Sequence, residues 1–234
     1  MTTEHRLRAD GSGQMFNQIA KRYDLLNRLM SFGLDRGWRR QLIESMPHTG
    51  QILDVATGTA DVALAIARAH PDVSVIGLDP SVGMLDVGHK KVDQRAMADR
   101  VKLVEGDAQA MSFADNTFAG TTIAFGIRNV PDRRLGLREM ARVTQSGGPV
   151  SVLELSEPKG GIMAFFARIH VHYLVPWMGS LISGKKEYRY LQSSIEAFPP
   201  AETFADMMAE AGFTDIEVRR LTFGTAHLYI GRAP

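Results

Sequence analysis

The chain contains 234 residues, of which 44% are hydrophobic and 23% charged, the proportions of an ordinary globular protein rather than a disordered or fibrous one. Lys and Arg number 27 against 26 Asp and Glu; a net charge of +1 gives no field for binding DNA or RNA, so nucleic acid is not expected as a partner. Cysteine is absent, which excludes disulfides, thiol catalysis and thiolate metal sites and fits a reducing compartment such as the cytoplasm.

Residues 1–45 are predicted to form a helical lid that precedes the main domain. Residues 1–10 carry charges before any apolar run, so they lack the core of a secretory signal. Between positions 14 and 40, apolar residues recur at three- and four-residue spacing, which places them on one helical face. They are Met15, Ile19, Tyr23, Leu26 and Met30. The main domain is expected to span residues 46–234.

Strands and helices alternate through most of that domain. The expected strands are 52–55, 73–78, 101–104, 121–125 and 150–155, and helical patterns follow the first, second and fourth of them. The last two strands, 216–221 and 226–230, have no helix between them, so they are expected to pair antiparallel. The pattern predicts an α/β fold: a Rossmann-like, doubly wound parallel sheet with an antiparallel final strand.

An apolar helical insertion is predicted at about 160–197. Its most membrane-like stretch is interrupted by His170, His172 and Pro176, and its uncharged run is shorter than the ~20 residues that cross a bilayer. The two histidines are two positions apart and point to different faces of a helix, so no metal site is expected there. The insertion is either ordinary core or a groove for a long apolar ligand or a membrane surface.

The candidate cofactor site follows the first strand. In an open parallel sheet, ligands bind beyond the carboxyl ends of the strands, where the first turn meets its helix. Asp54, Gly58 and Thr59 occupy that turn, and Asp79 ends the second strand 21 residues after Gly58. A carboxylate there can accept hydrogen bonds from both ribose hydroxyls, which suits any adenosine cofactor.

A second carboxylate distinguishes between the cofactors that contain adenosine. Asp107 and Ala108 follow the third strand, where a carboxylate and a backbone N–H can recognise the amino group and ring nitrogen of adenine. A nicotinamide oxidoreductase does not require that second acid, and its sheet is mostly parallel throughout. The alternative, that Asp79 and Asp107 are only polar strand ends, remains open, but the combination favours a class I S-adenosylmethionine-dependent methyltransferase.

The chain resembles the C-methyltransferases of ubiquinone and menaquinone biosynthesis from Met15 to Gly231. The segments that carry the resemblance are Lys21–Asn27 (KRYDLLN), Met30–Gly33 (MSFG), Phe125–Val130 (FGIRNV), Val152–Pro158 (VLELSEP) and Tyr188–Leu191 (YRYL), the last followed by Ser194 and Ile195. The resemblance implies that Thr59, Asp79, Asp107 and Ala108 bind S-adenosylmethionine. It also implies the acceptor, a polyprenyl quinol methylated on a ring carbon.

Two positions depart from the family pattern. Ala60 stands where the family usually has Gly, and its methyl group costs about 1 kcal/mol if the backbone there needs a positive φ. Ala124 stands where quinone-type members often have Ser, which removes a hydroxyl near the cofactor. Weaker cofactor binding is the expected consequence, without loss of the fold.

Methyl transfer to carbon is helped by ionisation of a neighbouring ring hydroxyl, so the site needs a group that faces that oxygen. Arg128 and Asn129 follow the fourth strand and are placed for this task. Arg128 would stabilise the phenolate, Asn129 would orient the oxygen, and Tyr23 would contact the acceptor when the lid closes. The competing interpretation is that Arg128 only pairs with Asp132 or Glu154.

Several functional alternatives remain at this stage. The predicted acceptor is demethylmenaquinol, and the alternative is the 2-polyprenyl-6-methoxy-benzoquinol of ubiquinone biosynthesis. A non-catalytic subunit that organises other quinone-biosynthesis enzymes is a third hypothesis, which Ala60 mildly favours. No metal is required. We expect a cytoplasmic protein with peripheral contact at the inner face of the membrane, and a homodimer as a further hypothesis.

Overall fold

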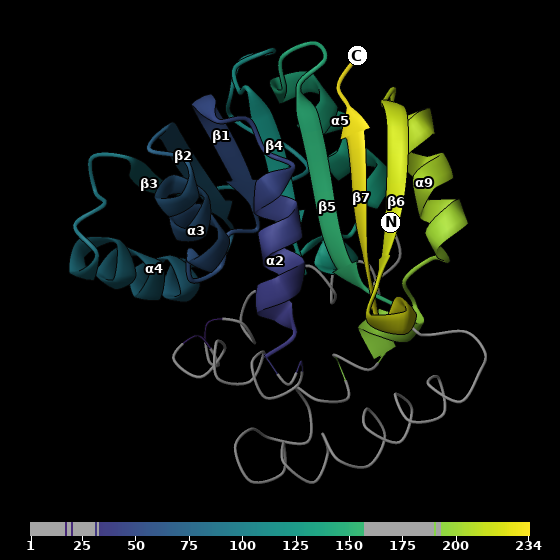
Figure 1. Ribbon diagram of the computed structural model, residues 1–234, viewed down its shortest axis with the longest axis horizontal. Coiled ribbons are helices and arrows are strands. Elements are labelled where there is room, and N and C mark those ends of the chain that lie inside the picture. Colours follow the sequence, from purple (N-terminus) through teal and green to yellow (C-terminus); the bar gives the residue numbers. More distant parts are fainter. Residues whose placement is uncertain (1–16, 18–19, 21–30, 32, 157–189, 191–192) are drawn as a thin grey trace, which may run out of the picture.

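The computed structural model describes residues 17, 20, 31, 33–156, 190 and 193–234. In this part of the chain, seven strands form one sheet in the order β3-β2-β1-β4-β5-β7-β6 (Figure 1). Their bounds are β1 Thr49–Val55, β2 Asp72–Asp79, β3 Val101–Glu105, β4 Gly120–Ala124, β5 Pro149–Leu155, β6 Thr214–Leu221 and β7 Ala226–Arg232. Strands β1 to β5 are parallel, and β7 runs antiparallel to both β5 and β6. The predicted doubly wound sheet with its antiparallel final strand is confirmed.

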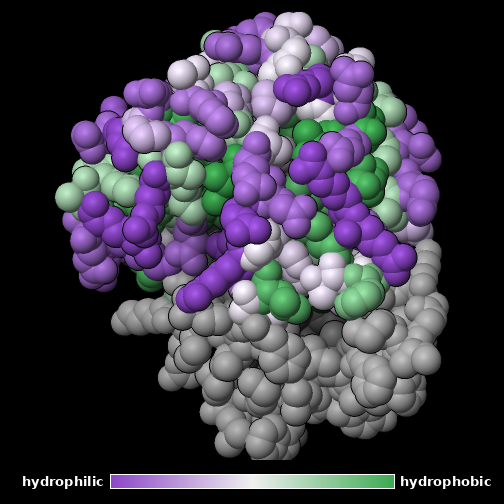
Figure 2. Space-filling model, in the orientation of Figure 1, coloured by the Kyte–Doolittle hydropathy of each residue, from purple (hydrophilic) through white to green (hydrophobic). Residues whose placement is uncertain are grey.

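Helices cover both faces of the sheet (Figure 1). One face packs against α2 (Asp35–Glu44), α3 (Asp61–Ala69) and α4 (Val82–Gln94). The other packs against α5 (Arg133–Val143) and α9 (Ala201–Glu210). Because both faces are covered, consecutive residues of a central strand are buried, as from Ile52 to Val55 of β1, rather than alternating with exposed ones. Figure 2 shows hydrophilic side chains over the outer surfaces of α2 and α4.

Polar side chains close the helix ends that border the carboxyl edge of the sheet. Ser81 caps α4, because its Oγ accepts a hydrogen bond from the Met84 N–H. Asp132 caps α5 through the Leu135 N–H. The connections that lead into these two helices are therefore held in fixed directions at the edge where the site lies.

Helix α2 belongs to the core, although it lies within the range predicted as a lid. Trp38 and Leu42 are buried between α2 and the sheet. A turn precedes the helix, with Gly33 at φ +74°, so the helical stretch expected up to residue 40 is not one continuous helix. The division at residue 45 remains a prediction.

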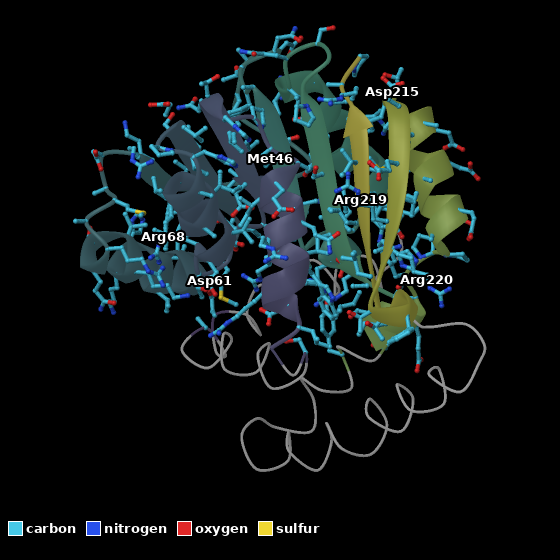
Figure 3. The ribbon with its side chains drawn as sticks, in the orientation of Figure 1. Met46, Asp61, Arg68, Asp215, Arg219 and Arg220 are labelled. Atoms are coloured by element: carbon cyan, nitrogen blue, oxygen red, sulfur yellow. The ribbon has the colours of Figure 1, made fainter. Side chains whose placement is uncertain are left out.

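The edge of the sheet at β6 carries charged side chains. Arg219 and Arg220 project from this strand (Figure 3), and Arg219 forms an ion pair with Glu217. Charged residues on an edge strand oppose the addition of another strand. Most of the predicted insertion at 160–197 lies outside the described residues. None of the helices within the described ranges is long and apolar enough to cross a bilayer.

Candidate active site

The turn after β1 is fixed by hydrogen bonds to its own strand and to β2. The Thr57 N–H donates to the Leu78 carbonyl at 3.0 Å, and the Thr57 hydroxyl donates to Asp54 Oδ2 at 2.6 Å. Gly58 and Ala60 both adopt left-handed backbone conformations, at φ +56° and +65°. The chain therefore reverses tightly at the carboxyl end of β1 before α3 begins.

Asp79 lies opposite this turn with both carboxylate oxygens engaged. Oδ2 accepts the Gly58 N–H and Oδ1 accepts the Ser81 N–H, each at 2.8 Å. A carboxylate has about four acceptor positions, so each oxygen can accept a second hydrogen bond from a ribose hydroxyl. Burial raises the pKa of Asp79, and the two backbone N–H groups oppose that shift.

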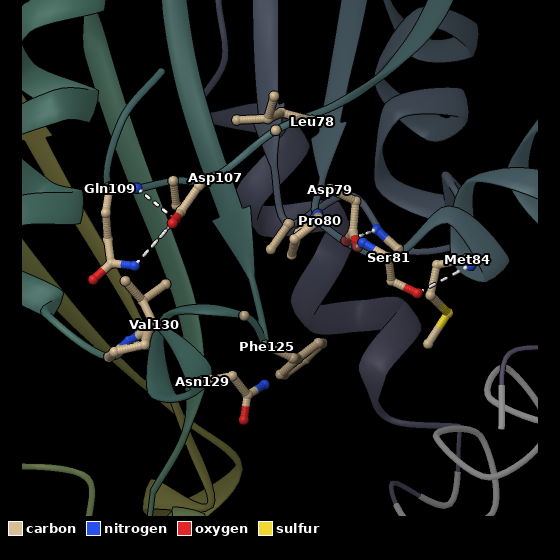
Figure 4. Close-up of a pocket in the computed structure, with 16 residues that line it drawn as sticks. Leu78, Asp79, Pro80, Ser81, Met84, Asp107, Gln109, Phe125, Asn129 and Val130 are labelled. Carbon is tan, nitrogen blue, oxygen red and sulfur yellow. Dashed lines mark hydrogen bonds between the residues drawn. The ribbon is translucent and has the colours of Figure 1, made fainter. Parts of the chain in front are cut away.

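A cavity of about 250 Å³ opens beside Asp79 (Figure 4). Five of the residues predicted from sequence line it: Gly58, Asp79, Asp107, Ala108 and Asn129. A smaller cavity of about 20 Å³ shares Ala56 and Gly58 with the first and includes Asp54 and Thr59. The fold therefore brings all six predicted cofactor residues into two adjoining cavities at the carboxyl ends of the strands.

Asp107 is an exposed residue at one wall of the larger cavity. It accepts hydrogen bonds from the Gln109 backbone N–H at 2.9 Å and from the Gln109 side chain at 3.1 Å (Figure 4). The side-chain oxygen of Gln109, Oε1, in turn accepts the Asp132 N–H at 2.9 Å. Gln109 thus connects the loop after β3 to the start of α5, and it is a cavity residue that the sequence analysis missed.

Asp54 and Thr59 stabilise the turn through hydrogen bonds to Thr57 and Lys91. Asp54 is 1% exposed, and burial raises its pKa to about 7 against the hydrogen bond from Thr57. The Thr59 hydroxyl accepts a hydrogen bond from Lys91 Nζ at 2.8 Å, and Lys91 also pairs with Asp61 at 2.7 Å. The Thr59 hydroxyl is therefore engaged with α4.

Arg128 and Asn129 lie in a short 3-10 helix, η1 (Ile127–Asn129), but they face different surroundings. Arg128 is buried and forms an ion pair with Glu154 of β5 at 2.6 Å. Its NH1 group also donates to the Phe125 carbonyl, and its backbone N–H donates to Glu154 Oε2. The structure favours the pairing interpretation of Arg128 over direct contact with a phenolate, since only Asn129 of the pair lines the cavity.

Asn129 makes a contact that the sequence pattern does not indicate. Its Oδ1 accepts a hydrogen bond from the Tyr190 hydroxyl at 3.1 Å, across 61 positions of sequence. Tyr23, the third predicted catalytic residue, lies outside the described residues. Within the described parts of the chain, no group of three or more His, Cys, Asp or Glu side chains could hold a metal ion.

Asn17, from the predicted lid, contacts the start of α4 next to the cavity. Its Oδ1 accepts the Ser81 hydroxyl at 2.7 Å and the Gly83 N–H at 2.9 Å. Asn17 lies close to Gly83, since a Cβ added to Gly83 would lie 2.9 Å from Asn17 Oδ1. Asn17 therefore connects the N-terminal segment to a helix that lines the cavity.

A family model described as the ubiE/COQ5 methyltransferase family matches residues 4–233. The chain belongs to this family. It is 45% identical to the ubiquinone/menaquinone biosynthesis C-methyltransferase UbiE of Geobacter sulfurreducens, over 98% of this chain and 91% of that protein. It is 43% identical to the demethylmenaquinone methyltransferase of Thermus thermophilus, over 94% of this chain and 100% of that protein. The resemblance found in the sequence is confirmed.

The fold of this ubiE/COQ5 family chain is also that of solved methyltransferases. A SAM-dependent methyltransferase from Aquifex aeolicus superposes with a TM-score of 0.64 at 14% identity, over 93% of this chain and 98% of that one. At this identity the similarity concerns the fold alone. It confirms the predicted class I methyltransferase architecture.

Phe125 is a cavity residue of this family member that the sequence analysis did not assign to the site. It follows β4 at φ +58°, a left-handed conformation that costs a non-glycine residue about 1–3 kcal/mol. Its ring lies 5.6 Å from the Arg39 guanidinium and 6.3 Å from the Trp38 ring. The neighbouring position 126 requires a glycine, because a Cβ added to Gly126 would lie 2.6 Å from the Cβ of Ala56. A Phe-Gly pair directly after a buried strand was the available signal.

Proposed function

We propose that this chain transfers a methyl group from S-adenosylmethionine to a ring carbon of demethylmenaquinol, giving menaquinol. Family membership and the name of the Thermus thermophilus relative support this acceptor. The observation that carries the proposal is one cavity with an engaged carboxylate, Asp79, at one wall and an amide, Asn129, at another. The first suits a ribose and the second suits the oxygen of an acceptor ring.

The donor groups of the cavity fit an adenosine cofactor. Asp79 would accept both ribose hydroxyls, with Gly58 holding its oxygen in place. Asp107 and Ala108 would recognise adenine, and Asp54 and Thr59 would shape the turn beneath the rest of the molecule. A bound S-adenosylmethionine would supply a methyl group on a sulfonium: a ring carbon can attack that methyl in line, the thioether leaves, and the ring carbon then loses its proton.

The residues of the chain would then position and activate the acceptor. Asn129 would donate its amide N–H to the ring oxygen, which stabilises negative charge as that hydroxyl ionises. Arg128 and Glu154 would hold η1 so that Asn129 stays at the cavity wall. Phe125 and Val130 line the cavity with apolar surface and would exclude water.

The proposal also concerns the cellular location and the partners of the protein. A polyprenyl tail gains about 0.8 kcal/mol for each CH₂ removed from water, so the acceptor would be taken from a bilayer surface. We therefore propose a cytoplasmic protein with peripheral contact at the inner face of the membrane, and we retain the predicted homodimer and contacts with other quinone-biosynthesis enzymes. Sedimentation with and without anionic vesicles tests the membrane contact and the oligomeric state.

The test is transfer of a labelled methyl group from S-adenosylmethionine to demethylmenaquinol in detergent. We expect label on the ring with the parent and at least tenfold less with Asp79→Asn, whose amide cannot accept both backbone N–H groups. Asp206→Asn, which changes an exposed aspartate of α9, is the matched control and should retain parent activity. Binding of NAD without binding of S-adenosylmethionine would refute the proposal.

A second acceptor is tested in the same experiment, because the Geobacter sulfurreducens relative is named for both quinones. Faster labelling of 2-polyprenyl-6-methoxy-benzoquinol than of demethylmenaquinol would assign the ubiquinone step. Cofactor binding without label on either quinol would support the non-catalytic subunit.

A further inference from the structure

The orientation of the Asn129 amide is the feature that extends the proposed function. Figure 4 shows its nitrogen turned toward Phe125 and its oxygen turned away. Phe125 and Asn129 both line the cavity. The oxygen is the atom that accepts the Tyr190 hydroxyl at 3.1 Å. The hydrogen bond and the direction of the amide are therefore consistent with each other.

The backbone that carries Asn129 is held independently of Tyr190. The Asn129 N–H donates to the Gly126 carbonyl at 3.0 Å. The preceding residue, Arg128, is fixed to Glu154 through both its backbone N–H and its guanidinium. The freedom that remains is rotation of the Asn129 side chain, above all the half-turn that exchanges its oxygen and nitrogen.

That half-turn decides whether the amide helps or opposes the reaction. With the nitrogen toward the cavity, the amide donates to a ring oxygen and stabilises the phenolate. With the oxygen toward the cavity, a partly negative carbonyl faces the developing anion and destabilises it. A tyrosine hydroxyl can donate or accept, but a phenol is the stronger donor, so a Tyr190 hydroxyl that donates to Oδ1 favours the first arrangement.

We propose that Tyr190 is a positioning residue for methyl transfer, one that orients the Asn129 amide so that its N–H groups face the acceptor oxygen. The proposal rests on the proposed function for the presence of a quinol oxygen in this cavity. It assigns Tyr190, which lies at the return from the predicted insertion, a direct connection to the chemistry at the end of β4.

The test is a double-mutant cycle of Tyr190→Phe and Asn129→Ala. For Tyr190→Phe we expect kcat to fall about fivefold to tenfold, the effect of one neutral hydrogen bond, with the Kd for S-adenosylmethionine unchanged. In the Asn129→Ala background the same substitution should have no further effect, because the amide it orients is gone. The matched control is Tyr229→Phe, which removes a buried hydroxyl that has no hydrogen-bond partner among the described residues and should leave kcat unchanged.

A second readout does not depend on turnover. The probe is 4-nitro-1-naphthol, bound with S-adenosylhomocysteine and titrated by the absorbance of its phenolate. We expect the parent to raise the ionisation constant of the bound probe about tenfold, since an N–H donor favours the charged form, and we expect both single variants to lose most of that effect.

The outcomes separate this inference from the proposed function. Any of three results would overturn the role of Tyr190. They are parent-like kcat and probe ionisation in Tyr190→Phe, a Tyr190→Phe effect that is undiminished in the Asn129→Ala background, and no binding of the probe. Absence of methyl transfer by the parent, with the probe behaving as expected in all variants, would refute the acceptor and leave Tyr190 as the residue that orients Asn129.

Discussion

Replacement of Asp54 by asparagine is expected to change how the stability of the protein depends on pH. Asp54 is buried, and its pKa is raised from 3.8 to about 7, first by burial. In the unfolded chain the same carboxylate ionises freely near 3.8. Above pH 7 the folded protein therefore holds a buried negative charge at a cost in stability, and this cost declines as the pH falls from about 7 to about 4.

The sign and the size follow from proton linkage. Between pH 4 and pH 7 the folded state binds a proton that the unfolded state does not bind, so the free energy of unfolding rises as the pH falls. A shift of about three pKa units corresponds to about 4 kcal/mol over the whole window. From pH 8 to pH 5 the Asp54 contribution amounts to about 3 kcal/mol, because pH 5 lies about two units below the raised pKa.

Asparagine removes the charge and can keep the contacts. Its oxygen can accept the Ala63 N–H that now donates to Asp54, and its amide can donate to the Thr57 hydroxyl, which serves as either donor or acceptor. The variant should therefore have a higher free energy of unfolding than the parent at pH 8. This difference should decrease by the Asp54 contribution as the pH falls from 8 to 5.

Urea denaturation of the cofactor-free protein at pH 5 and pH 8 measures the effect, with Asp206→Asn as the control for loss of an exposed carboxylate. The difference between parent and Asp54→Asn in this pH dependence isolates Asp54, because every other titrating group is common to both. An identical pH dependence in the two proteins would refute the argument.

Three further substitutions test the geometry around the cavity. Ala60→Gly removes a methyl group from a residue at φ +65° and should raise the free energy of unfolding by up to about 1 kcal/mol in urea; a decrease would contradict this. Gly126→Ala places a Cβ 2.6 Å from that of Ala56 and should weaken S-adenosylmethionine binding at least tenfold by calorimetry, whereas an unchanged Kd would show that the turn can yield. Asn17→Ala removes the acceptor of two hydrogen bonds at the start of α4 and should raise the KM for S-adenosylmethionine about fivefold with little change in kcat; an unchanged KM would separate Asn17 from cofactor binding.

The sequence by itself determined the sheet and the place of the site. The run Ile52–Val55 is buried throughout, and its consecutive apolar residues Ile52 and Leu53 identify it as a central parallel strand. Asp79 ends one strand and Asp107 follows the next, and the carboxyl ends of neighbouring parallel strands meet at one edge. Local patterns of this kind fix both the element and the side of the sheet to which its loop belongs.

The tertiary structure alone decided where the side chains at that edge point. Arg128 had two candidate partners, and the register of β5 brings Glu154 to it while Asp132 caps α5 instead. The backbone of Ala60 could not be assigned a positive φ from its residue type, since that conformation is rare for alanine.

The hydrogen bond between Tyr190 and Asn129 is a clearer case of an arrangement that the sequence does not predict. Sixty-one positions separate them, and no periodicity relates a residue at the end of the predicted insertion to the turn after β4. Local sequence patterns specify strands, turns and caps because those depend on neighbouring residues. The choice between competing partners of a polar side chain depends on which distant segments pack together, and only the folded chain settles it.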